Sequence, residues 1–216
     1  MKKFRFSMVF GICLVFLLTA GVLGQENIPT ITLPVSNLLK VRKDLIRKEG
    51  NAFPGSWSEY YQDYKIKTMH LFYDEEARPF DGVVVIPVTS EMEWVQALAK
   101  QDLYFESDEW AEKEYQEMNS LFNNILRFQI MVASESLNLL AKEDLRFVYQ
   151  DSTGMKRDGE IDHYELDETK MPIYSVLTMV FVSGLTNHQD ITWFSLHILN
   201  KKTAGRVDMR WKFRKD

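Results

Sequence analysis

Histidine is the residue type best suited to binding a metal or moving a proton, and the sequence contains four: His70, His163, His188 and His197. A helical zinc pair needs two histidines about three to five residues apart, and no two have that spacing. His70 and His197 fall in segments that we expect to be strands, so only tertiary folding could bring them together. We therefore interpret the four as isolated histidines and assign no metal ligand.

Oxygen ligands are concentrated in residues 151–162, whose sequence is DSTGMKRDGEID. Calcium takes about six to eight oxygen ligands, and an EF-hand loop has glycine at its sixth position. The sixth residue counted from Asp151 is Lys156, which excludes an EF-hand. An irregular calcium site remains an alternative. Because Asp and Gly are ordinary turn residues, we expect a plain hairpin turn here.

The sequence contains no recognisable catalytic or nucleotide-binding motif. G-x-S-x-G, G-x-x-x-x-G-K-[ST] and G-x-G-x-x-G are all absent. Cys13 is the only cysteine and lies in the apolar N-terminal segment, so the expected mature chain has neither a disulfide framework nor a Cys-based zinc site. The chain has 31 Asp and Glu residues, so some pair of carboxylates is expected at the distance that hydrolases use in any case. Such a pair is therefore no evidence for a hydrolase. We assign no catalytic, cofactor-binding or metal-binding residue.

Charge is distributed unevenly along the chain. Residues 101–120 contain seven acidic side chains and one basic one, whereas residues 201–216 contain seven basic and two acidic ones. The simplest interpretation is two solvated faces that neutralise each other weakly. The alternative is a face that docks a partner, or a basic C-terminal tip that contacts an anionic envelope polymer or lipid. The acidic residues are Asp102, Glu106, Asp108, Glu109, Glu112, Glu114 and Glu117.

Residues 1–24 have the order of a secretory signal peptide. Three basic residues precede an uncharged, mostly apolar run at 7–23, and Val22 and Gly24 suit the −3 and −1 positions of a cleavage site. We expect cleavage before Gln25, a single exported domain at 25–216, and a secreted or periplasmic location in a bacterial cell envelope. The alternative is an uncleaved membrane anchor, because the run is at the short end of the roughly 17–25 residues that span a bilayer.

The net charge is unfavourable for binding polyanions. The chain has 26 basic and 31 acidic residues, and removing Lys2, Lys3 and Arg5 leaves 23 against 31, a net charge of −8. This argues against nonspecific binding of nucleic acid or anionic lipid by the domain as a whole. The hydrophobic content of 45% is sufficient for a substantial core.

The hydrophobic pattern predicts a mainly β fold with a few helices. Ser90 and Glu93 fit a capping box at the start of one helix, and a second, acidic helix is expected after Ser107. A further helix is expected at 36–48, with a strand as the alternative, and an aromatic-rich loop is expected at 51–63. Strands are expected at 31–35, 65–73, 83–88, 125–132, 145–150, 174–182, 191–199 and 206–213.

These elements predict an α+β protein built on an antiparallel β-sandwich with two or three short helices, the acidic helix preceding the last strands. The final strand has one charged face and is expected at a sheet edge. The aromatic residues near the C-terminus are expected in the core rather than in a ligand platform: Trp193, Phe194, Trp211 and Phe213.

The segments FQIMVASES, EDLRFVYQDSTG, IYSVLTMVFVSG, ITWFSLHIL and GRVDMRWKF follow an apolar strand and a helix pair. This order, over roughly residues 83–213, resembles a loose group of exported bacterial Ig-like β-sandwich proteins of unknown function. The resemblance implies the fold and brings no functional residues. We expect a noncatalytic exported domain that binds another envelope component. The alternatives are an envelope hydrolase with dispersed carboxylates, and a membrane-tethered accessory subunit with an uncleaved N-terminal helix.

Overall fold

The computed structural model describes residues 30–31, 55–73, 80–121, 125–168, 173–184 and 191–213. The expected signal peptide at 1–24 and the expected helix at 36–48 lie outside these ranges. Of the strand expected at 31–35, the described residues include only Ile31, which belongs to β1 (Thr30–Ile31).

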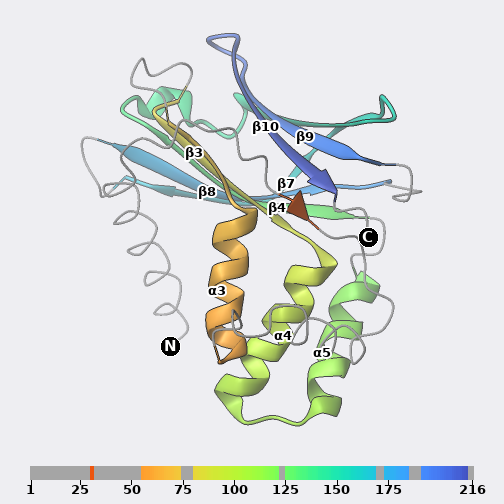
Figure 1. The fold of residues 1–216 in the computed structure, drawn as a ribbon. Helices are drawn as coiled ribbons and strands as arrows, with labels where there is room; N and C mark the ends of the chain where they lie inside the picture. Colours follow the sequence, from red (N-terminus) through yellow and green to blue (C-terminus); the bar gives the residue numbers. More distant parts are fainter. Residues whose placement is uncertain are drawn as a thin grey trace.

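Two five-stranded sheets form the sandwich that the sequence predicts (Figure 1). One sheet, called sheet B, has the order β2 (His70–Tyr73), β3 (Gly82–Val88), β4 (Leu126–Ser134), β8 (Tyr174–Val182) and β7 (Glu160–Asp167), all antiparallel. The other, sheet A, has the order β1, β10 (Gly205–Phe213), β9 (Trp193–Asn200), β5 (Leu145–Asp151) and β6 (Lys156–Asp158). Its pairs are antiparallel except that β1 runs parallel to the end of β10. Because β1 pairs only with Lys212 and Phe213, the rest of β10 is the edge of sheet A among the described residues, as the sequence predicts.

Alternation along each strand builds the core between the sheets, because successive side chains point to opposite faces. The inward-facing side chains of β4, β9 and β10 are almost completely buried: Phe128, Ile130, Val132, Phe194, Leu196, Ile198, Val207, Met209 and Trp211. Phe194 and Trp211 are thus core residues as expected. Trp193 differs, since it is only half-buried and lies under the guanidinium of Arg210 at 4.3 Å.

Gly159 joins β6 in sheet A to β7 in sheet B and closes one side of the sandwich. Its backbone N–H donates a 2.8 Å hydrogen bond to the carbonyl of Phe147. A Cβ atom at this position would lie 2.4 Å from Cγ1 of Val180 and 3.3 Å from Cβ of Phe147. Close packing therefore requires glycine where the chain passes from one sheet to the other.

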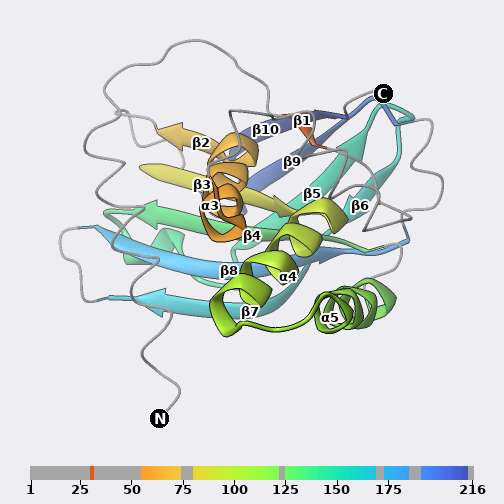
Figure 2. The same ribbon diagram turned by 60° about the horizontal axis from the view of Figure 1, so that its bottom comes forward.

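Three helices form a layer beneath sheet B (Figures 1 and 2): α3 (Trp57–Thr68), α4 (Ser90–Tyr104) and α5 (Asp108–Leu121). They share a second apolar core that includes Trp57, Trp94, Val95, Leu98 and Tyr115. This core also includes Ile86 on β3, and Arg127 on β4 forms a buried ion pair with Glu93 on α4. The helical layer is thus fastened to sheet B by both apolar and ionic contacts.

The helix α3 corrects two predictions made from the sequence. Residues 57–63 are helical rather than a loop, and a strand is present only at His70–Tyr73 rather than over 65–73. Ser56 caps the helix by accepting a hydrogen bond from the backbone N–H of Glu59 at 3.2 Å. The buried residues Trp57, Tyr60, Tyr64 and Thr68 recur at helical spacing. The alternation of side chains that predicted a strand from Lys65 onwards includes the last turn of α3 as well as β2.

The start of α4 also differs from its prediction. The cap is Thr89 rather than Ser90, with Oγ1 of Thr89 accepting a hydrogen bond from the N–H of Met92 at 3.1 Å. Glu93 does not complete a capping box with Ser90, because its carboxylate pairs with Arg127. The role of Glu93 therefore depends on Arg127, a partner distant in the sequence, which the local sequence pattern could not reveal.

Candidate functional site

The three histidines that the structure describes lie apart from one another. His70, on β2, packs edge-to-face on Trp211 at 5.4 Å, and burial lowers its pKa. His163 lies on β7 and His197 on β9 of the other sheet, while His188 is outside the described residues. Within the described part of the chain, no three His, Cys, Asp or Glu side chains are close enough to hold a metal ion.

His197 and Asp208 form the arrangement that most resembles an acid–base pair. Nδ1 of His197 lies 2.6 Å from Oδ1 of Asp208, which also pairs with Arg206. Desolvation acts to raise the pKa of Asp208, but hydrogen bonds from Arg206 and His197 lower it overall. Nε2 of His197 is enclosed and has no hydrogen-bond partner. An acid–base catalyst needs a nitrogen that substrate or water can reach, so this pair lacks the access that catalysis requires.

The expected hairpin turn is present at residues 152–155, between β5 and β6, whereas 156–158 form β6 and 160–162 belong to β7. Asp151 is buried, and its Oδ1 accepts hydrogen bonds from N–H and Oγ1 of Thr153 and from N–H of Met155, at 2.9, 2.6 and 3.3 Å. Its Oδ2 accepts from the Tyr149 hydroxyl at 3.1 Å. These bonds use the oxygens that a calcium ion would need, so Asp151 holds the turn instead.

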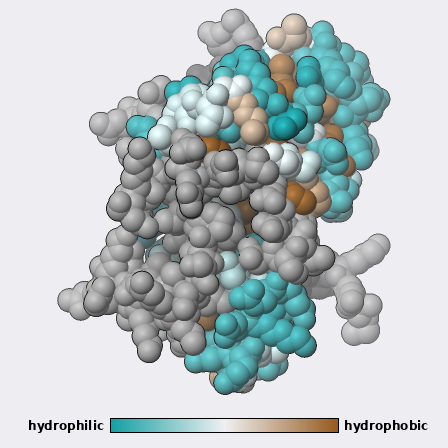
Figure 3. Space-filling view, turned by 90° about the vertical axis from the view of Figure 1, so that its right-hand side faces the viewer, coloured by the Kyte–Doolittle hydropathy of each residue, from teal (hydrophilic) through white to brown (hydrophobic). Residues whose placement is uncertain are grey.

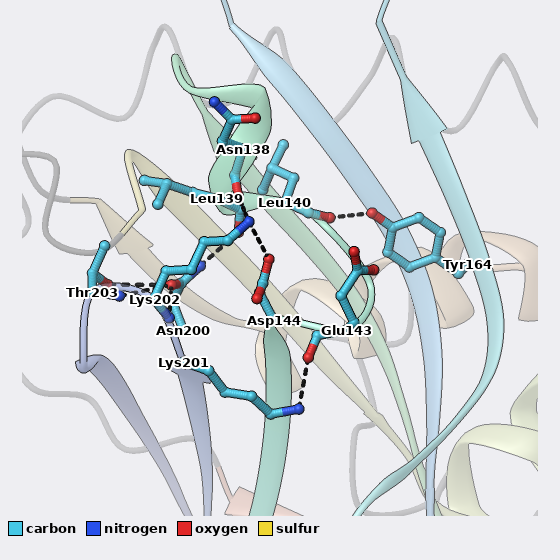
Figure 4. Close-up of polar contacts among 10 residues, drawn as sticks. All are labelled: Asn138, Leu139, Leu140, Glu143, Asp144, Tyr164, Asn200, Lys201, Lys202 and Thr203. Carbon is cyan, nitrogen blue, oxygen red and sulfur yellow. Dashed lines mark hydrogen bonds and ion pairs between the residues drawn. The ribbon is translucent and has the colours of Figure 1, made fainter.

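The basic segment near the C-terminus braces a corner of the sandwich (Figure 4). Nζ of Lys202 lies 2.6 Å from Oδ2 of Asp144, and Nζ of Lys201 donates to the carbonyl of Glu143 at 2.7 Å. Asn200, almost completely buried, donates to the carbonyl of Leu139 at 2.8 Å. These contacts join the β9–β10 turn to the short helix η2 (Leu137–Leu139) and the residues after it. They give Lys201 and Lys202 a structural role.

The acidic segment also has local partners. Oδ2 of Asp102 accepts a 2.8 Å hydrogen bond from the backbone N–H of Trp57 at the start of α3. Lys100 pairs with Glu114, and Lys113 with Glu117. None of these pairs joins the acidic segment to the basic one, and α5 and β10 belong to different layers (Figure 1). These contacts therefore do not neutralise the acidic segment with the basic one.

The α4–α5 turn carries Phe105, the most exposed of the large apolar side chains that the structure describes. Phe105 is 96% exposed and Leu103 62% exposed, with Tyr104 between them at 45%. Figure 1 shows that α4 runs away from sheet B and α5 returns, so this turn lies at the end of the helical layer farthest from the sheets. We call residues Leu103–Phe105 the tip.

The backbone of the tip is strained as well as exposed. Phe105 has φ 56° and ψ 38°, the left-handed conformation that usually takes glycine at a helix C-terminus. The N–H groups of Phe105 and Glu106 both bond to the carbonyl of Gln101, which ends α4. Left-handed backbone costs a non-glycine residue about 1 kcal/mol. The position therefore carries a phenylalanine that neither the fold nor the turn favours.

Hydrogen bonds brace the residues on either side of the tip. Nε2 of Gln101 donates a 2.7 Å hydrogen bond to Oδ1 of Asp108, linking the end of α4 to the start of α5. Oγ of Ser107 accepts from the N–H of Trp110 at 3.2 Å and caps α5. Figure 3, viewed from the side where α5 lies, shows a mainly hydrophilic surface over the helical end.

Sequence analysis did not identify the tip, although a signal was present. Leu103, Tyr104 and Phe105 are three consecutive apolar residues within an acidic segment, and such runs are unusual on a surface unless they are functional. A second group of exposed apolar residues is less informative. Leu71 and Tyr73 alternate with the more buried Phe72 on β2, as expected for the outward face of a strand at the edge of a sheet.

No family model matches the chain, and no curated protein is significantly similar to it in sequence. In the ranges that the structure describes, no helix is both long enough and apolar enough to cross a bilayer. The fold defines a mainly β, two-sheet sandwich with a three-helix layer that ends in an apolar tip.

Proposed function

We propose that this protein is a noncatalytic exported domain of the cell envelope that binds another envelope component through the tip. The observation that carries this proposal is the exposure of Phe105, 96% accessible in a left-handed backbone conformation. Aromatic residues are enriched among the side chains that dominate binding energy at protein interfaces. Strain and exposure at one residue cost stability, which is common at functional positions.

Two further features support binding rather than hydrolysis. The hydrolase alternative requires acidic groups that converge in a cleft with raised pKa values. The pKa of Asp208, beside His197, is instead lowered, and Nε2 of His197 is enclosed.

The exported location rests on the order of residues 1–24 alone.

Photo-crosslinking tests the proposal directly. A benzoylphenylalanine at position 105 of the full-length protein should give a discrete adduct in cells that naturally make the protein. The same group at position 66 serves as a control, because Ile66 is also apolar and 55% exposed but lies on α3. No adduct from position 105, or equal adducts from both positions, would refute the proposal.

The fate of the N-terminal segment separates the exported domain from the tethered alternative. The intact mass of the native protein is measured after cell fractionation. A soluble envelope species that begins near Gln25 supports export with cleavage. A full-length species in the membrane fraction supports the tethered accessory subunit instead.

A further inference from the structure

We propose that the tip docks into an apolar pocket on a partner protein, and that lysine or arginine side chains border this pocket. The inference rests on the proposed function and specifies the chemistry of the occupant. Its basis is the combination of two exposed apolar side chains, Leu103 and Phe105, with the carboxylates that surround them.

The residues that surround the tip are strongly negative. Residues 102–112 contain five acidic side chains and no lysine or arginine. The nearest bases in the sequence, Lys100 and Lys113, are paired with Glu114 and Glu117. The acidic residues are Asp102, Glu106, Asp108, Glu109 and Glu112.

Two of these carboxylates are placed to meet a partner. Asp102 and Asp108 already accept hydrogen bonds within the protein, from Trp57 and Gln101. Glu106 follows Phe105 directly, and Glu109 lies in the first turn of α5; both are exposed. Hydrogen bonds from its own backbone N–H and from Ser107 lower the pKa of Glu109 and hold its exposed carboxylate at the start of α5.

The charge selects a protein over a lipid surface. Bacterial membranes expose anionic lipids, which repel a segment bearing several carboxylates. A protein pocket can bury the ring of Phe105 and place cations opposite Glu106 and Glu109, which aids encounter and specificity. The bracing of the turn by Gln101 and Asp108 means that little conformational freedom is lost on docking.

The test combines the photo-crosslinker at position 105 with removal of charge from the full-length chain. E106Q/E109Q should lower the adduct yield by about threefold or more, because two charge pairs at the rim are lost. E160Q/D162N, which removes two carboxylates from β7, should leave the yield unchanged. A carbodiimide, which joins a carboxylate to an amine in contact with it, should link Glu106 or Glu109 to a lysine of the same partner protein.

The possible outcomes separate this inference from the proposed function. A protein adduct whose yield is insensitive to E106Q/E109Q overturns the cationic rim and leaves the binding function in place. An adduct on lipid, or on a second copy of this chain, overturns the proposed occupant. Failure to form any adduct at position 105 overturns both proposals.

Discussion

The indole Nε1 of Trp211 donates a 2.9 Å hydrogen bond to the backbone carbonyl of Thr68, which lies 143 residues earlier in the chain. Trp211 is a fully buried residue of β10 in sheet A, and Thr68 ends α3 just before β2 of sheet B. The bond therefore joins the last strand to the junction between the helical layer and the other sheet. The ring of Trp211 also stacks on Phe194 at 5.1 Å.

Replacing Trp211 with phenylalanine should separate these two contributions. W211F keeps an aromatic ring against Phe194 but leaves the buried carbonyl of Thr68 without this donor, a loss of about 1–3 kcal/mol in the free energy of unfolding. Urea denaturation measures the change. The control is W193F, because Trp193 is half-buried on the outer face of sheet A. Equal stabilities for W211F and W193F would contradict the assigned role of the hydrogen bond.

Gly159 should not tolerate even one added methyl group. In G159A, Cβ would lie 2.4 Å from Cγ1 of Val180, so the core must shift at a cost of about 1–3 kcal/mol. The double variant G159A/V180A removes the clashing methyl group. It should be less destabilised than the sum of the two single variants, as measured by a double-mutant cycle. Additive effects would show that Val180 does not impose the requirement for glycine.

The strain at Phe105 predicts a variant that is stable but inactive. F105G removes the exposed ring and relieves the left-handed backbone, so the unfolding free energy should stay unchanged or rise by up to about 1 kcal/mol. F105A also removes the ring but retains the strain, and should be less stable than F105G. A crosslinker on Leu103 in each background reports binding, which both variants should lose. If F105G were clearly destabilised, Phe105 would instead be a structural residue.

Asp208 should make the stability of the protein depend on acidic pH. Its folded-state pKa lies below the ordinary value of 3.8, so ionised Asp208 stabilises the folded protein at neutral pH. That contribution is lost as the pH falls through the folded-state pKa. The stability difference between wild type and D208N should therefore be present at pH 7 and shrink in strong acid. R206M should reduce the same pH dependence, and a difference that grows in acid would contradict the assignment.

The sequence predicted most of the strands because their signal is local, but it missed β6 and β7, whose side chains are largely exposed and show no apolar alternation. Alternation over Tyr174–Val182 and along β4, β9 and β10 repeats every two residues, and burial of one face against the other sheet preserves that pattern. The helices α4 and α5 were also predicted, since their apolar stripes lie within single segments. The helix α3 was missed for two reasons. Its buried face consists of aromatic and polar side chains, and an alternating pattern that resembles a strand extends over its last turn.

The sequence by itself determined the mainly β composition, the two central helices, and the absence of familiar catalytic motifs. Only the tertiary structure decided which charges act within the fold and which face outwards. Lys202 and Glu93 are ordinary charged residues in sequence, yet they pair with Asp144 and Arg127 because the fold brings distant segments together. The exposure of the tip, which is a run of three apolar residues in the sequence, was likewise decided by the packing of α4 on α5. That packing buried Tyr115 and Ala111 and left Phe105 exposed at the turn between the helices.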